Sequence, residues 1–90
     1  MEPEMSMPIH RHRNTSETVI MLRGKANWLY YDEQGNVTDT FILEAGGPLC
    51  GVNVPKGQWH NTVCLEHDTV IFEVKDGVYE PLSADDILTI

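Results

Sequence analysis

Residues 10–24 read His-Arg-His-Arg-Asn-Thr-Ser-Glu-Thr-Val-Ile-Met-Leu-Arg-Gly, and this stretch decides both the expected fold and the expected site. His10 and His12 are two residues apart, so in an extended strand their side chains leave the same face and can converge on one ion. We expect the tight turn over residues 13–16 to reverse the chain and place the Glu17 carboxylate on the neighbouring strand, beside the two imidazoles. The stretch therefore predicts three ligands of a metal site built on β-structure.

His60 is the fourth candidate ligand, and it arrives from far along the chain. It follows the turn Pro55-Lys-Gly57 and begins a predicted strand whose inward positions also include Thr62 and Cys64. Three of the chain's 4 histidines thus join one carboxylate in a pattern that suits a metal ion.

The rest of the chain predicts further strands. Short segments rich in Val, Ile, Tyr, Trp and Thr alternate with turns that contain Gly, Pro, Asn or Asp, as in all-β sandwiches and barrels. The expected strands are 7–13, 18–23, 26–32, 37–43, 51–54, 59–65 and 69–75.

The last of these strands has a clear two-residue alternation. We expect Val70, Phe72 and Val74 to face inward, and the intervening residues 69, 71, 73 and 75 to face outward. Beyond it, Ser83 predicts the cap of one short helical turn over residues 84–86. We therefore expect at most one C-terminal helical turn in an otherwise all-β chain.

Size and composition define the class of protein. Ninety residues suit a single domain over 1–90, with a barrel at about 7–75 and a tail over 76–90, and so small a core needs extra support. The net charge of −8 argues against a nucleic-acid partner. Neither a long apolar run nor a signal-like start is present, which predicts a cytoplasmic protein without membrane contact, and we expect Cys50 and Cys64 to be reduced.

Two separated motifs resemble those of the cupin superfamily. His10-x-His12, four residues, Glu17, six residues and Gly24 match the first cupin motif after its opening glycine, which Glu4 replaces here. Pro55-x-Gly57-x-x-His60 resembles the second motif, with Cys64 in place of its asparagine. The resemblance implies a double-stranded β-helix, the jelly-roll barrel of cupins, with one divalent metal ion held by the four ligands.

Longer segments resemble the WbuC-type cupin metalloproteins. These segments are residues 8–13, residues 55–60 and the run Phe-Glu-Val-Lys-Asp-Gly-Val-Tyr-Glu-Pro over 72–81. Genes of that family often lie among polysaccharide biosynthesis genes, which implies a sugar or a polysaccharide precursor as the small-molecule ligand. Together with the exposed sheet edges expected of a short barrel, the resemblance also predicts a homodimer.

The chemistry stays open among three hypotheses. Mixed imidazole and carboxylate ligation suits Fe, Mn, Ni, Cu or Zn, and an open site permits isomerisation, epimerisation or oxidation of a sugar. The alternatives are a binding module that holds its ligand without turnover, and a purely structural metal. An enzyme would need a proton carrier, and apart from Glu17 we expect only Tyr30 or a metal-bound hydroxide to serve.

Five side chains are candidates for lining a substrate pocket, although barrel filling is their ordinary role. They are Met21, Trp28, Tyr30, Cys64 and Phe72. We expect Arg11 and Arg13 to lie on the outer face as solubilising charges.

Overall fold

A computed structural model describes residues 8–77 and 84–88 of the chain. Its elements, in chain order, are β1 (Ile9–His10), β2 (Glu17–Arg23), β3 (Lys25–Tyr31), β4 (Val37–Glu44), β5 (Gly51–Val54), β6 (Trp59–Cys64), β7 (Val70–Lys75), the 3-10 turn η1 (Ala84–Asp86) and β8 (Ile87–Leu88). Within these residues there is no helix with the length and apolar character needed to span a membrane.

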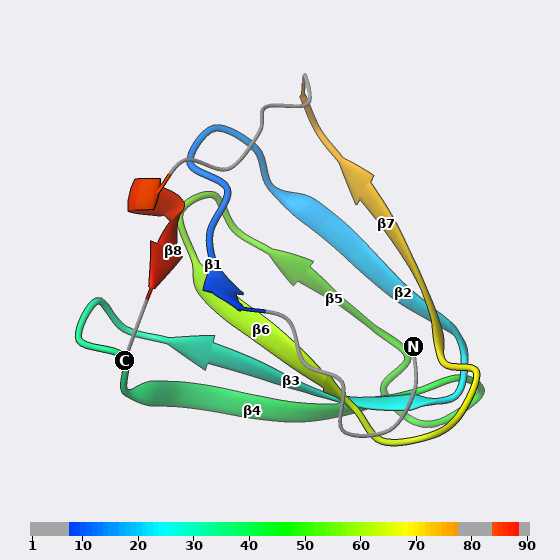
Figure 1. Ribbon diagram of the computed structural model, residues 1–90. Coiled ribbons are helices and arrows are strands. Elements are labelled where there is room, and N and C mark those ends of the chain that lie inside the picture. Colours follow the sequence, from blue (N-terminus) through cyan, green and yellow to red (C-terminus); the bar gives the residue numbers. More distant parts are fainter. Residues whose placement is uncertain (1–7, 78–83, 89–90) are drawn as a thin grey trace.

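The strands form two antiparallel sheets that face each other (Figure 1). One sheet has five strands in the order β4-β3-β6-β1-β8, and the other has three in the order β5-β2-β7. The chain crosses repeatedly from one sheet to the other, for example between β1 and β2, between β5 and β6, and between β6 and β7. This arrangement confirms the predicted all-β, double-stranded β-helix class.

The main core cluster lies between the sheets and reaches the histidines, because its Trp28 ring stacks on His60. Alternate residues of β2 and β3 point inward, and Val19, Met21, Ala26 and Trp28 are buried against Leu43 and Val54. Fully burying a side chain of this kind stabilises a fold by about 1.5–3 kcal/mol. Burial of alternate residues therefore fixes which face of each strand looks toward the site.

The predicted strand boundaries agree with the structure within about two residues for six of the seven strands. The exception is the first, because strand geometry covers only Ile9–His10 of the predicted 7–13 and leaves His12 just beyond it. The short strand β8, which pairs with β1, was not predicted. The helical turn over 84–86 is confirmed, while its expected cap Ser83 lies outside the described residues.

The predicted facing of β7 is wrong. Val70, Phe72 and Val74 are 46%, 50% and 49% exposed, so they point away from the barrel. The register with β2 explains this result, because Phe72 lies opposite the exposed Ile20, whereas Ile71 lies opposite the buried Met21. Directly paired residues share one face of a sheet, and the alternation of β7 alone could not show which phase β2 would impose.

Gly24 connects β2 to β3 in a conformation that only glycine adopts easily. Its φ is +87°, and a Cβ at this position would overlap Thr69 Oγ1 and lie 2.9 Å from Thr69 Cα. Thr69 is itself buried and bonds its hydroxyl to the carbonyl of Glu66. The last glycine of the first motif is therefore required for both backbone angle and space.

We predict that Gly24→Ala lowers the free energy of unfolding by more than about 2 kcal/mol, because strain and steric overlap add. Gly46→Ala is the matched control, since Gly46 also has a positive φ of 75° but has no atom within 4 Å of the added Cβ. Urea denaturation measures both variants. Equal losses in the two would contradict the overlap with Thr69.

Candidate metal site

His10 and His60 lie directly opposite each other on the antiparallel pair β1 and β6. Opposed residues of such a pair have Cβ atoms about 4.5–5.5 Å apart. Their ring centroids are 4.3 Å apart, and both residues are buried. The pairing of β1 with β6 thus brings together two motifs whose histidines, His10 and His60, lie fifty positions apart in the sequence.

His12 joins this pair although it lies past the end of β1. Its ring centroid is 5.3 Å from that of His10 and 5.9 Å from that of His60. Ligand nitrogens of the three histidines all lie within 4.8 Å of one another, which is close enough to share one ion. The predicted convergence of the three imidazoles is therefore seen.

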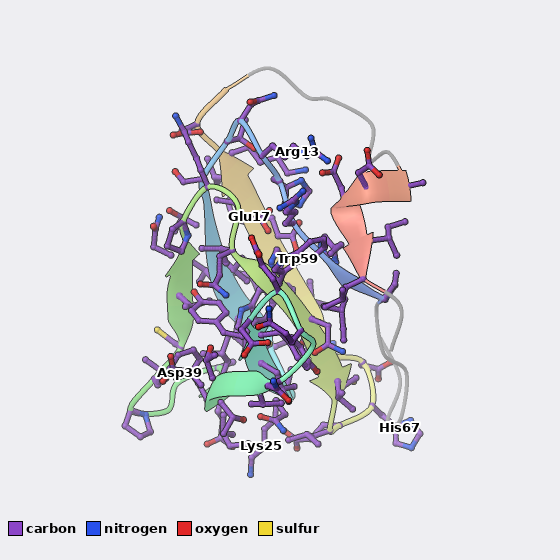
Figure 2. The ribbon with its side chains drawn as sticks, turned by 90° about the vertical axis from the view of Figure 1, so that its left-hand side faces the viewer. Arg13, Glu17, Lys25, Asp39, Trp59 and His67 are labelled. Atoms are coloured by element: carbon purple, nitrogen blue, oxygen red, sulfur yellow. The ribbon has the colours of Figure 1, made fainter. Side chains whose placement is uncertain are left out.

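Glu17 reaches the histidines from the facing sheet. The expectation that it would sit on the strand next to His10 is wrong, because β2 pairs with β5 and β7 and not with β1. Its Oε1 still lies 3.2 Å from His60 Nε2 and 3.6 Å from His12 Nε2. The four residues thus form a cluster that bridges the two sheets, near the end of the barrel where Figure 2 labels Glu17 and Arg13.

Two backbone carbonyls orient the imidazoles. His10 Nδ1 lies 2.8 Å from the carbonyl oxygen of Pro8, and His60 Nδ1 lies 2.9 Å from that of Gln58. A carbonyl can only accept, so each Nδ1 carries the proton and each Nε2 keeps a lone pair. Such a second hydrogen bond is typical of histidines that ligate metals.

Burial and charge set the protonation of the cluster. Burial lowers the pKa of His10 below its ordinary value, and His60 and His12 lower it further against the hydrogen bond to Pro8. Burial also lowers the pKa of His12, outweighing the attraction of Glu17. For Glu17, burial alone would raise the pKa, but the contact with His60 and the nearby His12 and Lys75 leave it lowered. Neutral imidazoles beside an ionised carboxylate are the forms that bind a metal.

One oxygen of the cluster is a buried polar atom without a hydrogen-bond partner among the described residues, as are the indole nitrogens of Trp28 and Trp59. Among the described residues, none hydrogen-bonds Glu17 Oε2, although the side chain is only 2% exposed. A buried carboxylate oxygen without a partner is costly, and a cation at this position removes the cost. The donor set, its convergence and this oxygen all fit a divalent metal.

The C-terminal segment holds the short ligand strand in place. Asp86 Oδ1 accepts a hydrogen bond from Arg13 Nε at 2.6 Å and lies 3.4 Å from Arg11 Nε. The Arg11 guanidinium also lies over the Trp59 ring, 4.4 Å from its centroid. Arg11 and Arg13 are therefore not merely solubilising charges. The only sequence signal for this contact was the opposite charge of the two arginines and of Asp85 and Asp86.

The second motif is tied to the first through its glycine. Gly57 has φ +76° and donates its backbone N–H to the carbonyl oxygen of His12, 2.8 Å away. The turn that delivers His60 therefore also fixes the backbone of His12.

The predicted pocket residues have four different environments. Met21 and Trp28 belong to the core, and Trp28 stacks on His60 with ring centroids 5.5 Å apart. Cys64 is buried and donates its thiol to the carbonyl of Glu66. Tyr30 is half-buried on the site's face of β3, opposite His60, and its hydroxyl donates to the Asn53 carbonyl. Phe72 points outward, so its predicted inward position is wrong.

The reversed phase of β7 places two other residues on the site's side of the three-stranded sheet, where Lys75 is half-buried and Glu73 stays exposed. Lys75 lies opposite Glu17 and Glu73 opposite Val19, on the side of β2 that faces the histidines. Partial burial raises the pKa of the Glu73 carboxyl, and the charge of Glu17 raises it further. The expectation that Glu73 and Lys75 lie on the side of β7 away from the site is therefore wrong.

Comparison with known proteins places the chain among solved structures. The capsular polysaccharide assembling protein CapF from Staphylococcus aureus matches with a TM-score of 0.76 at 18% identity, over 89% of this chain and 23% of CapF. An oxalate decarboxylase from Bacillus subtilis, which has Mn(II) centres, matches with a TM-score of 0.72 at 21% identity, over 100% of this chain and 22% of the decarboxylase. Both are cupin-fold proteins.

The chain has the cupin fold. It spans less than a quarter of the length of either protein, and identity at this level shows the fold alone. A family described as a domain of unknown function (DUF6016) matches residues 1–43, and no curated protein matches. The cupin resemblance of the two sequence motifs is thus confirmed at the level of fold.

We predict that the metal-free protein becomes less stable as pH falls from 7 to 5. His10 and His12 have lowered pKa values in the folded state, so below about pH 6.5 the unfolded chain binds more protons than the folded one. Proton binding therefore stabilises the unfolded state and lowers the free energy of unfolding. Thermal unfolding in the presence of a chelator measures the slope.

A His10→Gln variant should show a shallower pH slope than the wild type over this range. His67→Gln should keep the wild-type slope, because His67 is exposed at the opposite end of the barrel (Figure 2). A wild-type stability that stays constant or rises toward pH 5 would contradict the proposed neutral cluster.

Proposed function

We propose that this chain is a metal-dependent cupin of the WbuC type that acts on a sugar or sugar-derived metabolite. The observation that carries the proposal is the buried cluster of three imidazoles around Glu17, a set of donors that no packing requirement explains. In this proposal His10, His12, Glu17 and His60 hold one divalent transition metal.

A divalent transition metal held by these four side chains would still be able to bind a substrate oxygen. When bound, the metal supplies Lewis-acid or redox chemistry at a carbonyl or hydroxyl group. The thiol of Cys64 is not among the proposed metal ligands, since it donates a hydrogen bond to the backbone carbonyl of Glu66. Mixed nitrogen and oxygen ligation supports Fe, Mn, Ni, Cu or Zn.

Glu73 is the residue best suited to carry a proton in this site. It is an exposed carboxylate on the site's side of β7, outside the ligand cluster, and the direction of its pKa favours exchange of a proton nearer to neutral pH. Lys75, two residues along the same face, supplies positive charge for an anionic group of the substrate. The pKa of Tyr30 is raised by burial, then by Asp39 and Glu17, which favours its neutral, hydrogen-bonding form.

Two observations support a sugar as the ligand class. The segments at residues 8–13, 55–60 and 72–81 resemble WbuC-type cupins, and the structurally similar CapF is named as a capsular polysaccharide assembling protein. A vicinal diol or hydroxy-carbonyl group of a sugar also offers two adjacent oxygens, which matches the remaining metal positions.

A structural metal is the second candidate. The small core and the two-residue strand β1 favour it, because metal binding to a site absent from the unfolded chain adds directly to folding stability. A binding module without turnover uses the same ligands and makes Glu73 dispensable.

The test combines turnover, binding and stability on protein loaded separately with Fe(II), Mn(II) and Zn(II). Nucleotide sugars and simple sugars form the panel, and NMR follows both product formation and ligand binding. We predict turnover that is lost in His60→Ala and reduced about 10²-fold or more in Glu73→Gln at unchanged metal content. Glu66→Gln is the matched control, since Glu66 is an exposed carboxylate next to His67, at the end of the barrel opposite the site.

Saturable binding without product would replace the enzyme with a binding module. Absence of both, together with unfolding by a chelator, would leave a structural metal and contradict the proposed chemistry.

A further inference from the structure

The outward residues of the three-stranded sheet form an exposed surface that we call the outer face. It consists of Thr18, Ile20, Leu22, Gly51, Asn53, Val70, Phe72 and Val74. Its apolar members are far from buried, with Ile20 at 40%, Leu22 at 58% and Phe72 at 50% exposure. Figure 1 shows β2 and β7 as the wall of the molecule farthest from β8, so none of the described strands covers this face.

The outer face carries no charge among these eight residues, in a chain with 14 acids and 6 bases. The charged residues of the same strands, Glu17, Glu73 and Lys75, occupy the opposite, inward positions. Arg23 lies at one end of the face, where a bulge sets it opposite Val70. On β7 three apolar residues therefore face outward and the charged residues lie on the site's side, whereas a sheet with one solvated face usually has the opposite arrangement.

We propose that the outer face is the interface of a homodimer, in which the three-stranded sheets of two copies pack face to face about a two-fold axis. The proposed dimer does not depend on the proposed function. In it the two copies pack through the faces of their sheets, whereas the sequence led us to expect pairing through sheet edges.

Electrostatics favours a second copy as the occupant. Two chains of net charge −8 repel each other over most of their surfaces, and the repulsion is least where a face without acidic residues meets its own copy. A charged partner protein would be recognised by complementary charge, which this face does not offer. Two-fold packing also lets each apolar side chain meet an apolar side chain.

The available area fits a small dimer. Half-exposed aromatic and branched side chains contribute on the order of 100 Å² each, so the five apolar residues supply about half of the ~800 Å² per partner in a standard interface. The polar neighbours Thr18 and Asn53, which are exposed and bonded to each other, extend the surface. Aligned sheet packing of this kind is the usual way in which two β-faces bury each other.

Sedimentation velocity on the full chain tests the proposal across a range of micromolar concentrations. We expect a wild-type dimer, and a dissociation constant raised at least about tenfold by Phe72→Asp or Val74→Asp. Ile42→Asp is the matched control, because Ile42 is 47% exposed on β4 of the other sheet and should leave the dimer intact.

A second measurement needs no substitution. In a mixture of isotope-labelled and unlabelled wild-type protein, intermolecular nuclear Overhauser effects should connect the Phe72 ring with the methyl groups of Ile20 or Val74. A monomeric wild type would overturn the proposal and leave the face to a different protein. A dimer broken by Ile42→Asp but not by Phe72→Asp, or with intermolecular effects only elsewhere, would also overturn it.

Discussion

The contact between Glu17 and His60 joins the two halves of this fold. Glu17 comes from the three-stranded sheet and His60 from the five-stranded sheet, and their side-chain atoms approach to 3.2 Å in a site where both residues are almost fully buried. Burying a carboxylate without a matched cation costs several kcal/mol. Packing alone would favour an apolar residue at this position, so a requirement other than packing explains Glu17. The neighbouring features all help to hold this contact: the β1–β6 register, the Gly57 hydrogen bond and the pairing of Arg11 and Arg13 with Asp86.

The register of β7 against β2 has a second, wider effect. Because Lys75 lies opposite Glu17 and Phe72 opposite Ile20, the charged residues of β7 face the site and the apolar ones face away. The same shift that supplies the site with Glu73 also creates the uncharged outer face. The proposed role of Glu73 and the proposed dimer interface thus both depend on the register of a single strand.

Much of this could be predicted from the sequence, and the failures have physical causes. The convergence of His10, His12 and His60 beside Glu17 was predictable because side-chain chemistry and spacing coincide in two motifs, and Gly24 and Gly57 mark turns with positive φ. The facing of β7 was not predictable, because alternation gives two phases and only the partner strand chooses between them. The contact of Asp86 with Arg11 and Arg13 joins residues more than seventy positions apart, and no local pattern reports such a pairing. Glu17 was assigned to the wrong sheet because a turn of a given length fits both a hairpin and a crossover between sheets.

The central claim is that one metal ion is held by the four clustered residues. The most direct measurement is elemental analysis of the untagged protein, purified without added metal, beside a His10→Ala, His60→Ala double variant. Near-stoichiometric iron, manganese, nickel, copper or zinc in the wild type and none in the variant is the predicted result. Absence of metal from the wild type, even after reconstitution with each ion, would contradict the account.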